Sequence, residues 1–282
     1  MDSYIFAVVL LAALLHATWN AFVKVNGDRM VFMAVMMTAS GIAALGTTPF
    51  LPLPNAPSWP YIAVSVLLHQ GYIAFLLLAY RLGELSHVYP LARGSAPLIV
   101  ALLSITLIGE DLTGPALLAV VMMAVGIISL SFTRGAQGLR DPWTVFFALG
   151  TGLFIAGYTL VDGLGARLAG SAHGYAAWMI GFDWIPILSF ALWKRGIGAF
   201  GRIGRVWSSA VLMGLTSLAA YWAVIWAMTV APIALVAALR ETSIVFAVLF
   251  GVLFLRERLN LIRLAATFST LAGVVLVKVS RH

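Results

Sequence analysis

The sequence has no cysteine among its 282 residues, which excludes disulfides, cysteine metal sites and thiol chemistry. Charge is also scarce: Asp, Glu, Lys and Arg make up 10% of the residues, whereas a soluble domain has about 25%. No break between apolar runs is longer than about 15 residues, so the loops leave no room for a soluble domain.

Several catalytic signatures are missing as well. A P-loop is absent, which excludes an ATP-driven motor. The sequence also lacks an HExxH or comparable metal cluster and a nucleophile elbow with matching His and Asp residues. We therefore expect no enzyme activity, no cofactor and no metal, and a membrane enzyme acting on lipid head groups is disfavoured.

What the chain does have is apolar surface, because 62% of its residues are hydrophobic. A soluble protein of this size could not bury so many apolar side chains, so the solvent must be a lipid bilayer. The net charge of +7 does not indicate nucleic-acid binding, because Lys and Arg lie mostly in short loops, where they act as topology signals.

The apolar runs are long enough to cross a membrane, which takes roughly 20 residues per helix. Irregular backbone facing lipid is prohibitive, so the runs are expected to be helices and the fold class an all-α membrane protein. The predicted spans are 4–24, 31–51, 60–80, 86–108, 113–133, 143–162, 174–193, 207–228, 232–255 and 261–279.

An internal repeat becomes visible when the chain is shifted by 147 residues. The shift aligns Arg93 with Arg240, Glu110 with Glu257, Leu112 with Leu259 and Gly126 with Gly273. Each half then holds five helices, at 1–133 and 143–282, joined by a linker at 134–142. Because five is odd, the second half crosses the membrane in the opposite sense, which predicts the inverted repeat of many secondary transporters.

The sidedness follows from the positive charges of the loops. The side with both termini carries three Lys or Arg (Arg167, Lys278 and Arg281), whereas the other side carries twelve, including Lys194 and Arg195. This distribution places the second side in the cytoplasm and both termini outside.

These residues resemble the drug/metabolite transporter superfamily, specifically its EamA-type members. The resemblance is carried by Trp19-Asn20 with Lys24, and by the paired segments "GEDLTGPALLAVVMMAVGIIS" and "RERLNLIRLAATFSTLAGVVL". The length and "LLHATWNAFVK" are also similar to a subgroup linked to phosphonate utilisation. The resemblance implies ten helices, a transport function and termini in the cytoplasm, which is opposite to the sidedness from the charge count.

Two arginines lie deep in predicted spans, Arg93 in the fourth and Arg240 in the ninth, where Glu241 follows it. An arginine at a helix centre costs roughly 2.5–3.5 kcal/mol on insertion scales, which makes such residues functional candidates. Their planar guanidinium groups match a carboxylate or phosphate. In the alternative interpretation, Arg240 pairs with a neighbouring helix and Arg93 caps carbonyl groups at a kink before Pro97.

Other polar and aromatic side chains are candidates for the wall of a central cavity. His16, Trp19 and Asn20 share one face of the first helix, and Ser65, His69 and Tyr72 form a stripe on the third. The alternative for these residues is helix packing through hydrogen bonds. The predicted substrate-binding residues are Trp19, Asn20, His69, Tyr72, Tyr89, Arg93, Tyr158, Tyr221, Arg240 and Glu241.

Three titratable side chains are candidates for coupling transport to protons: Glu241, Asp183 and His69. Asp183 could instead accept a hydrogen bond from an adjacent helix. Pro186, three residues later, is expected to kink the same helix.

The sequence therefore predicts a multi-pass protein of the cell (inner or plasma) membrane, as a monomer or weak dimer. We expect a secondary transporter, exporting or exchanging a small anionic or zwitterionic metabolite such as an amino acid, organic acid or organophosphate. The alternatives are an exporter of cationic drugs or amines, and a membrane scaffold that transports nothing.

Overall fold

The computed structural model describes residues 1–25, 28–83, 85–132, 139–201, 204, 207–255 and 261–279, without the side chains of 24–25, 85–86 and 254–255. Glu257, Leu259 and Arg281, and the side chain of Lys24, therefore lie outside the described residues. The described residues contain helices and no strands.

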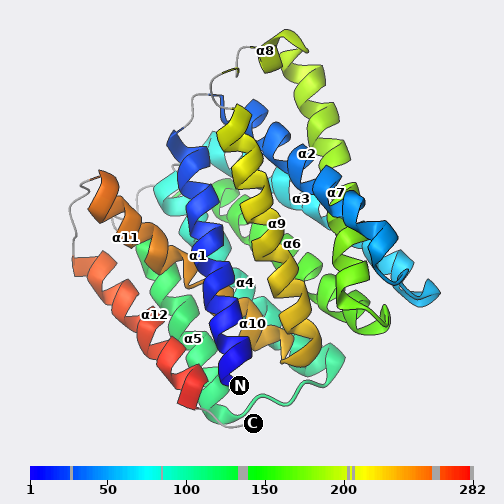
Figure 1. Ribbon diagram of the computed structural model, residues 1–282. Helices are drawn as coiled ribbons and strands as arrows, with labels where there is room; N and C mark the ends of the chain where they lie inside the picture. Colours follow the sequence, from blue (N-terminus) through cyan, green and yellow to red (C-terminus); the bar gives the residue numbers. More distant parts are fainter. Residues whose placement is uncertain are drawn as a thin grey trace.

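Helices follow one another along the whole chain (Figure 1). The long ones are α1 (Ser3–Val25), α2 (Arg29–Thr47), α3 (Trp59–Leu82), α4 (Leu85–Leu103), α5 (Gly114–Ser129), α6 (Pro142–Leu168), α7 (Ala172–Arg195), α9 (Trp207–Val230), α11 (Ser243–Leu255) and α12 (Leu261–Val279). The short ones are η1 (Thr48–Phe50), η2 (Ala56–Ser58), the π-helix η3 (Ser104–Ile108), η4 (Leu130–Phe132), α8 (Gly198–Gly201) and α10 (Ile233–Arg240).

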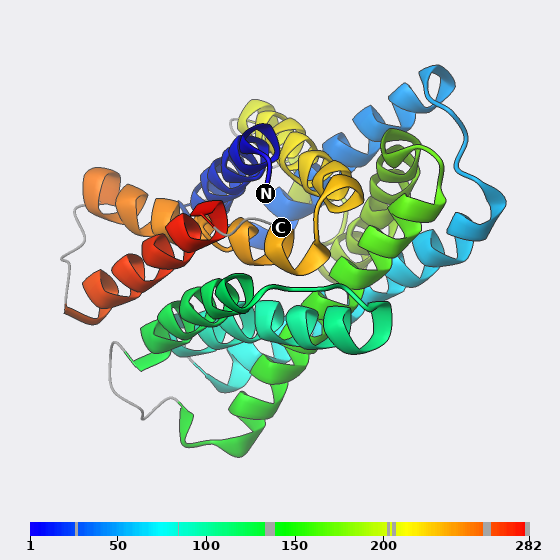
Figure 2. The same cartoon turned by 90° about the horizontal axis from the view of Figure 1, so that it is seen from below.

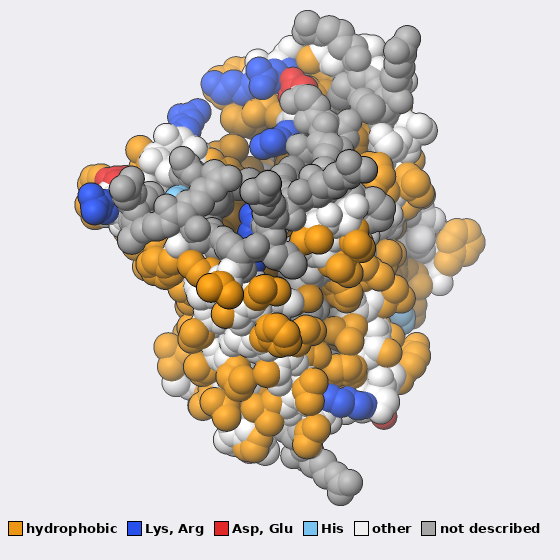
Figure 3. All heavy atoms as spheres, turned by 90° about the vertical axis from the view of Figure 1, so that its left-hand side faces the viewer, with side chains coloured by type: hydrophobic (Ala, Val, Ile, Leu, Met, Phe, Trp, Pro, Cys, Tyr) orange, Lys and Arg blue, Asp and Glu red, His pale blue; other side chains and the backbone are white. Residues whose placement is uncertain are grey.

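Ten of these segments are long and apolar enough to cross a membrane, which confirms the predicted number of spans. Both termini lie at one end of the molecule and α8 lies at the other (Figure 1). Hydrophobic side chains cover the middle of the face in Figure 3, and Lys and Arg gather mainly toward the α8 end.

The helix neighbours follow the predicted inverted repeat. Helices α2 and α7, α5 and α12, and α4 and α10 hold equivalent positions in the two halves, and each pair packs together. The contact of α1 with α9 has its counterpart in that of α3 with α6. These pairs keep their partners when the two halves are exchanged, as expected for two repeats related by a two-fold axis.

Small residues allow the close contact between α5 and α12, which lie side by side in Figure 2. A Cβ atom on Gly126 would lie 3.0 Å from the Ala266 carbonyl oxygen, and one on Gly273 would lie 2.9 Å from that of Ala119. The Ser269 hydroxyl also donates to the Met122 carbonyl at 2.8 Å, and these two residues are equivalent in the repeat. The predicted packing role of the two glycines is thus confirmed.

Two predicted helices differ from those observed. The span predicted at 143–162 continues to Leu168, so the segment "GLGARL", expected to form a loop, is the last part of α6. Gly163 and Gly165 allow close neighbours there, since Cβ atoms would lie 2.5 Å from Ile233 Cδ1 and 2.6 Å from Tyr61 Cβ. The span predicted at 232–255 is interrupted after Arg240, whereas α7 continues through Pro186 as one helix.

Candidate functional site

The interruption between α10 and α11 lies where the chain has two adjacent charges. Backbone N–H groups of Glu241 and Thr242 donate to the carbonyls of Ala238 and Leu239, three residues earlier, so the helix tightens into a turn. Arg240 ends α10 and Glu241 lies in this turn. Broken helices near the bilayer midplane line the binding sites of many secondary transporters.

Arg93 and Arg240 approach the middle of the membrane from opposite ends. At about 1.5 Å per residue, Arg93 lies about 12 Å along α4 from Leu85, and Arg240 lies about 10.5 Å along α10 from Ile233. The hydrocarbon core is about 30 Å thick, so both side chains lie near its centre.

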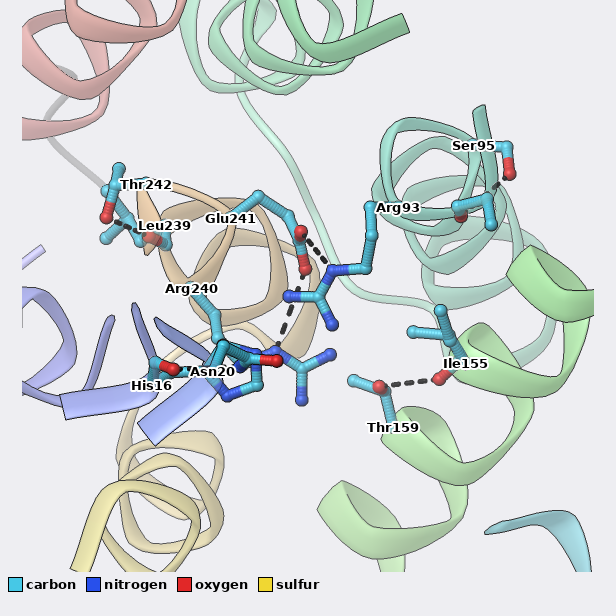
Figure 4. Close-up of polar contacts among 11 residues, drawn as sticks. His16, Asn20, Arg93, Ser95, Ile155, Thr159, Leu239, Arg240, Glu241 and Thr242 are labelled. Carbon is cyan, nitrogen blue, oxygen red and sulfur yellow. Dashed lines mark hydrogen bonds and ion pairs between the residues drawn. The ribbon is translucent and has the colours of Figure 1, made fainter. Parts of the chain in front are cut away.

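Glu241 lies beside both arginines (Figure 4). Arg93 Nε donates to Glu241 Oε2 at 2.8 Å, and Arg240 Nε lies 3.8 Å from Glu241 Oε1. Arg93 thus pairs with a carboxylate of the other repeat and does not cap carbonyl groups before Pro97 through this nitrogen. Two guanidinium groups sharing one carboxylate leave a positive charge in the centre of the molecule.

The three side chains are almost fully enclosed, since Arg93 and Arg240 are each 4% exposed and Glu241 is 0% exposed. Arg93 Nη2, Arg240 Nε and Glu241 Oε1 are buried without a hydrogen-bond partner. A buried polar group without a partner costs about 1–3 kcal/mol, and a charged one costs more. The site therefore holds charged donors that an additional anionic group could satisfy.

A cluster of rings lies next to the arginines. His69 of α3 stacks on Tyr158 of α6 with ring centroids 4.0 Å apart. Tyr221 of α9 and Tyr72 of α3 pack edge-on against Tyr158, at 6.4 and 6.0 Å. The Arg240 guanidinium carbon lies 5.9 Å from the Tyr158 ring centroid, within cation–π range. The structure thus brings four predicted ring side chains together beside Arg240.

The predicted stripe on α1 is divided between the site and the helix packing. Figure 4 places His16 and Asn20 beside Arg240. Asn20 Nδ2 donates to the His16 carbonyl at 2.8 Å, a bond within its own helix. Trp19 packs instead against a core cluster of α2 and α9 that includes Phe32 and Met213, which favours the packing interpretation for this residue.

Arg93, Arg240 and Glu241 form a triad of charged side chains. Two predicted residues, Tyr89 and Asp183, remain to be placed. Tyr89 is one helical turn before Arg93 on α4 and is partly buried. Asp183 of α7 is 7% exposed and accepts a hydrogen bond from Gln70 of α3 at 3.3 Å. This bond corresponds to the alternative considered for Asp183, in which the carboxylate bonds to an adjacent helix.

Asp162 was not among the predicted residues, yet it is a completely buried carboxylate in the bundle. It accepts hydrogen bonds from the hydroxyls of Tyr175 on α7 at 3.0 Å and Tyr221 on α9 at 2.5 Å. Residue 162 is the last residue of the predicted span 143–162, and a carboxylate at the end of a span is common. If the helix had been predicted to continue past residue 162, Asp162 would have lain inside it, four residues after Tyr158, and would have been a candidate site residue.

A second group that the sequence did not predict, formed by Glu110 and Arg167, lies at the end of the molecule that carries the termini. Arg167 Nη2 lies 2.7 Å from Glu110 Oε1, and the same oxygen accepts the backbone N–H of Ile233 at 3.0 Å. Arg167 also donates to the carbonyls of Met228 and Ala231 at 2.9 and 3.0 Å. We call Glu110 and Arg167 the clasp, because their contacts join the α4–α5 connection of the first repeat to α6, α9 and α10 of the second.

A hollow of about 410 Å³ lies between α1 and α9, lined by apolar residues with Trp222 and Trp226. His173 accepts a hydrogen bond from Trp222 Nε1 at its edge, at 2.8 Å. Neither arginine lines this hollow. The triad is therefore separate from it and closed off in this conformation.

Comparisons with known proteins support the fold and the class. Residues 142–279 match the family described as "EamA-like transporter family". No curated protein matches the chain significantly. Among solved structures, 29 chains match significantly. One, titled "Crystal structure of protein", superposes with a TM-score of 0.77 at 18% identity over 99% of both chains.

The structural likeness extends over both repeats, and at 18% identity it concerns the fold alone. The family match covers the second repeat almost from end to end. Residues 142–279 are therefore an EamA family domain, and the ten apolar helices of the whole chain are consistent with an EamA-type membrane transporter of the drug/metabolite transporter superfamily.

Proposed function

We propose that the protein is a secondary transporter of a small anionic or zwitterionic organic metabolite, and that Arg93 and Arg240 hold its carboxylate or phosphate. The observation that carries this proposal is the shared carboxylate: Glu241 lies between two buried guanidinium groups and neutralises only one positive charge. A bound anion would supply the second negative charge and the missing acceptors for Arg93 Nη2 and Arg240 Nε.

The ring cluster supports a substrate with an apolar part next to its anionic group. Tyr158, His69, Tyr72 and Tyr221 present ring surfaces beside Arg240. Apolar walls with a few fixed polar groups are typical of small-molecule sites. Amino acids, organic acids and organophosphates with a hydrophobic portion fit this description.

Movement would occur by alternating access, with one five-helix repeat rocking against the other around the triad. The triad suits this role because Arg93 comes from the first repeat and Arg240 and Glu241 from the second. We place the protein in the cell (inner or plasma) membrane, as a monomer or weak dimer.

The cationic alternative requires a carboxylate that is free to bind the substrate. Glu241 is paired with Arg93, and Asp183 accepts a bond from Gln70. The excess of positive charge at the triad would also repel a cation. The anionic proposal therefore accounts for the contacts better.

Ligand-induced thermal stabilisation of the purified protein tests the proposal. We expect stabilisation by members of an amino acid, organic acid and organophosphate panel, and loss of that effect in Arg240→Gln. Arg195→Gln is the matched control, because Arg195 is half exposed and pairs with Asp28 at 3.4 Å, far from the triad in sequence. Stabilisation by lipophilic cations alone, abolished in Asp183→Asn, would instead support the cationic alternative.

A further inference from the structure

Asp162 is a buried charged group that the anion site does not use. Its side chain is 0% exposed, and its hydrogen bonds come from the hydroxyls of Tyr175, Tyr221 and Ser65, not from a lysine or arginine. An ionised carboxylate can only accept hydrogen bonds, and the two tyrosines are matched to that state. A carboxylate charge without a cation partner is costly in a low-dielectric interior, and binding a proton removes it.

Asp162 is connected to the anion site through Tyr221. The Tyr221 hydroxyl bonds to Asp162, while its ring packs on Tyr158 at 6.4 Å and on His69 at 5.8 Å. Tyr158 in turn lies 5.9 Å from the Arg240 guanidinium carbon. A protonated Asp162 has one O–H group that must donate, so at least one of the hydroxyls around it must accept a hydrogen bond instead of donating one. Where that hydroxyl is Tyr221, protonation changes the bonding of a ring that packs on Tyr158 and His69.

All the elements that pack on α6, except η2, contribute charged or titratable groups near Asp162 or near the ring cluster. Helix α3 contributes His69, and α7 contributes Tyr175 and Asp183. Helix α9 contributes Tyr221, whereas Arg93 of α4 and Arg240 of α10 face the ring cluster. The segment η2 (Ala56–Ser58) contains no ionisable side chain. Arg240 therefore lies beside Tyr158, while Tyr221 joins the same ring cluster to Asp162.

The charges of the core determine which states can cross the membrane at low cost. With Asp183 in its neutral form, the two arginines and Glu241 of the empty site leave one positive charge, which an ionised Asp162 balances. In the loaded site a monovalent anion balances that positive charge, so Asp162 must be protonated to keep the core neutral. Loading with only the anion, or only the proton, leaves a net charge deep in the hydrocarbon region, which is costly.

We propose that Asp162 is the proton-binding site of the transporter, and that one proton and one anion cross together in the same direction. This inference rests on the proposed anion-binding function of Arg93 and Arg240. The step is the protonation of a carboxylate to a carboxylic acid on one side of the membrane and its reversal on the other. It differs from coupling through Glu241, Asp183 or His69, which the sequence alone suggested.

Proton uptake on ligand binding tests this proposal in the wild type. The purified protein in lipid nanodiscs, in weak buffer with a pH indicator, would be titrated with N-acetyl-L-phenylalanine, a monovalent carboxylate with an aromatic ring. We expect about one proton to be taken up per anion bound, by the charge neutrality argued above. Binding without proton uptake would overturn the role of Asp162 and leave the anion site standing.

Two variants identify the proton-binding group. Asp162→Asn should bind the anion without taking up a proton, whereas Asp183→Asn, the matched control, should keep the uptake. Proton uptake that survives in Asp162→Asn, or disappears in Asp183→Asn, would overturn the proposal.

Infrared difference spectroscopy of the wild type at decreasing pH provides a readout that needs no anion. The carbonyl band of a protonated carboxylic acid should appear and should be missing in Asp162→Asn. If the band behaves in this way while no anion of the panel binds, the anion-binding function fails and the proton site remains. A band that persists in Asp162→Asn overturns the site itself.

Discussion

Glu241 stabilises a pair of arginines that would otherwise repel each other in the middle of the membrane. Its two oxygens lie 2.8 Å from Arg93 Nε and 3.8 Å from Arg240 Nε. Removing one partner of a buried ion pair leaves an uncompensated charge, which is more costly than removing the pair. The stability of the triad therefore depends on the balance of charge among its three residues rather than on any one of them.

The first prediction concerns stability. Glu241→Gln leaves two buried guanidinium groups without their carboxylate and should lower the free energy of unfolding by about 3–5 kcal/mol. Arg93→Met leaves Glu241 paired with Arg240, so it leaves no uncompensated charge and should lower the stability less. Thermal unfolding in detergent measures both, and an Arg93→Met variant as unstable as Glu241→Gln would contradict the buried-pair argument.

The second prediction concerns the shape of the charged group. Arg240→Lys keeps the positive charge but loses the planar fork that binds a carboxylate through two hydrogen bonds. We expect uptake of the best-stabilising anion into proteoliposomes to fall by at least about tenfold, equivalent to ~1.4 kcal/mol of binding. Arg195→Lys, at an exposed position, serves as the control. Wild-type uptake by Arg240→Lys would exclude a bidentate contact.

At the scale of whole elements, the contact between α5 and α12 depends on two glycines that the repeat makes equivalent. A Cβ atom on Gly273 would lie 2.9 Å from the backbone oxygen of Ala119. The same Cβ atom would also meet the Met123 side chain. Backbone atoms cannot move aside as a flexible side chain can. The helices must therefore separate if the position gains a side chain.

Gly273→Ala should accordingly lower the melting temperature. Gly46→Ala on α2 is the control, because a Cβ atom there would meet nothing within 4 Å. At that open position the greater helix propensity of alanine should leave stability unchanged or slightly higher. Equal melting temperatures for the two variants would show that the contact between α5 and α12 is looser than described.

On the scale of the whole molecule, the clasp of Arg167 and Glu110 joins the two repeats at the end with the termini. It combines the 2.7 Å ion pair with bonds to the backbone of α9 and α10. Arg93 and Arg240 are each 4% exposed, and we expect access to them from this end to require that the clasp opens. Breaking it should favour conformations open at this end.

Arg167→Gln tests this expectation in a chain that has no cysteine of its own. A reporter at Ala234→Cys, in the first turn of α10 and 0% exposed, should react faster with a polar thiol reagent when Arg167→Gln is added. A reporter at Ala148→Cys, also 0% exposed but near the start of α6, should not react faster. Unchanged labelling of Ala234→Cys would mean that the clasp does not hold this end closed.

Sidedness is the last property of the whole molecule. The Lys and Arg distribution predicts that both termini lie outside the cell, and the family resemblance predicts that they lie inside. We expect Asp2→Cys to react in intact cells with a thiol reagent that cannot cross the membrane. Labelling only after the cells are opened would favour the orientation implied by the resemblance.

The sequence by itself determined the spanning helices, the equivalence of Arg93 with Arg240, and the packing role of Gly126 and Gly273. These features are local or periodic: a bilayer requires about 20 apolar residues per span, and a repeat aligns residues at a constant shift. Burial of two arginines could be inferred in the same way, because each lies far from the ends of an apolar run.

The tertiary structure alone decided which side chains are partners. Asp162 gains its tyrosine donors from α7 and α9, and Arg167 reaches Glu110, which is 57 residues earlier in the chain. Likewise, Glu241, in the break after Arg240, pairs with Arg93 of the other repeat. Hydropathy records how deep a residue lies but not which direction its side chain faces. Those contacts depend on how the helices pack, and adjacent residues on one helix point about 100° apart.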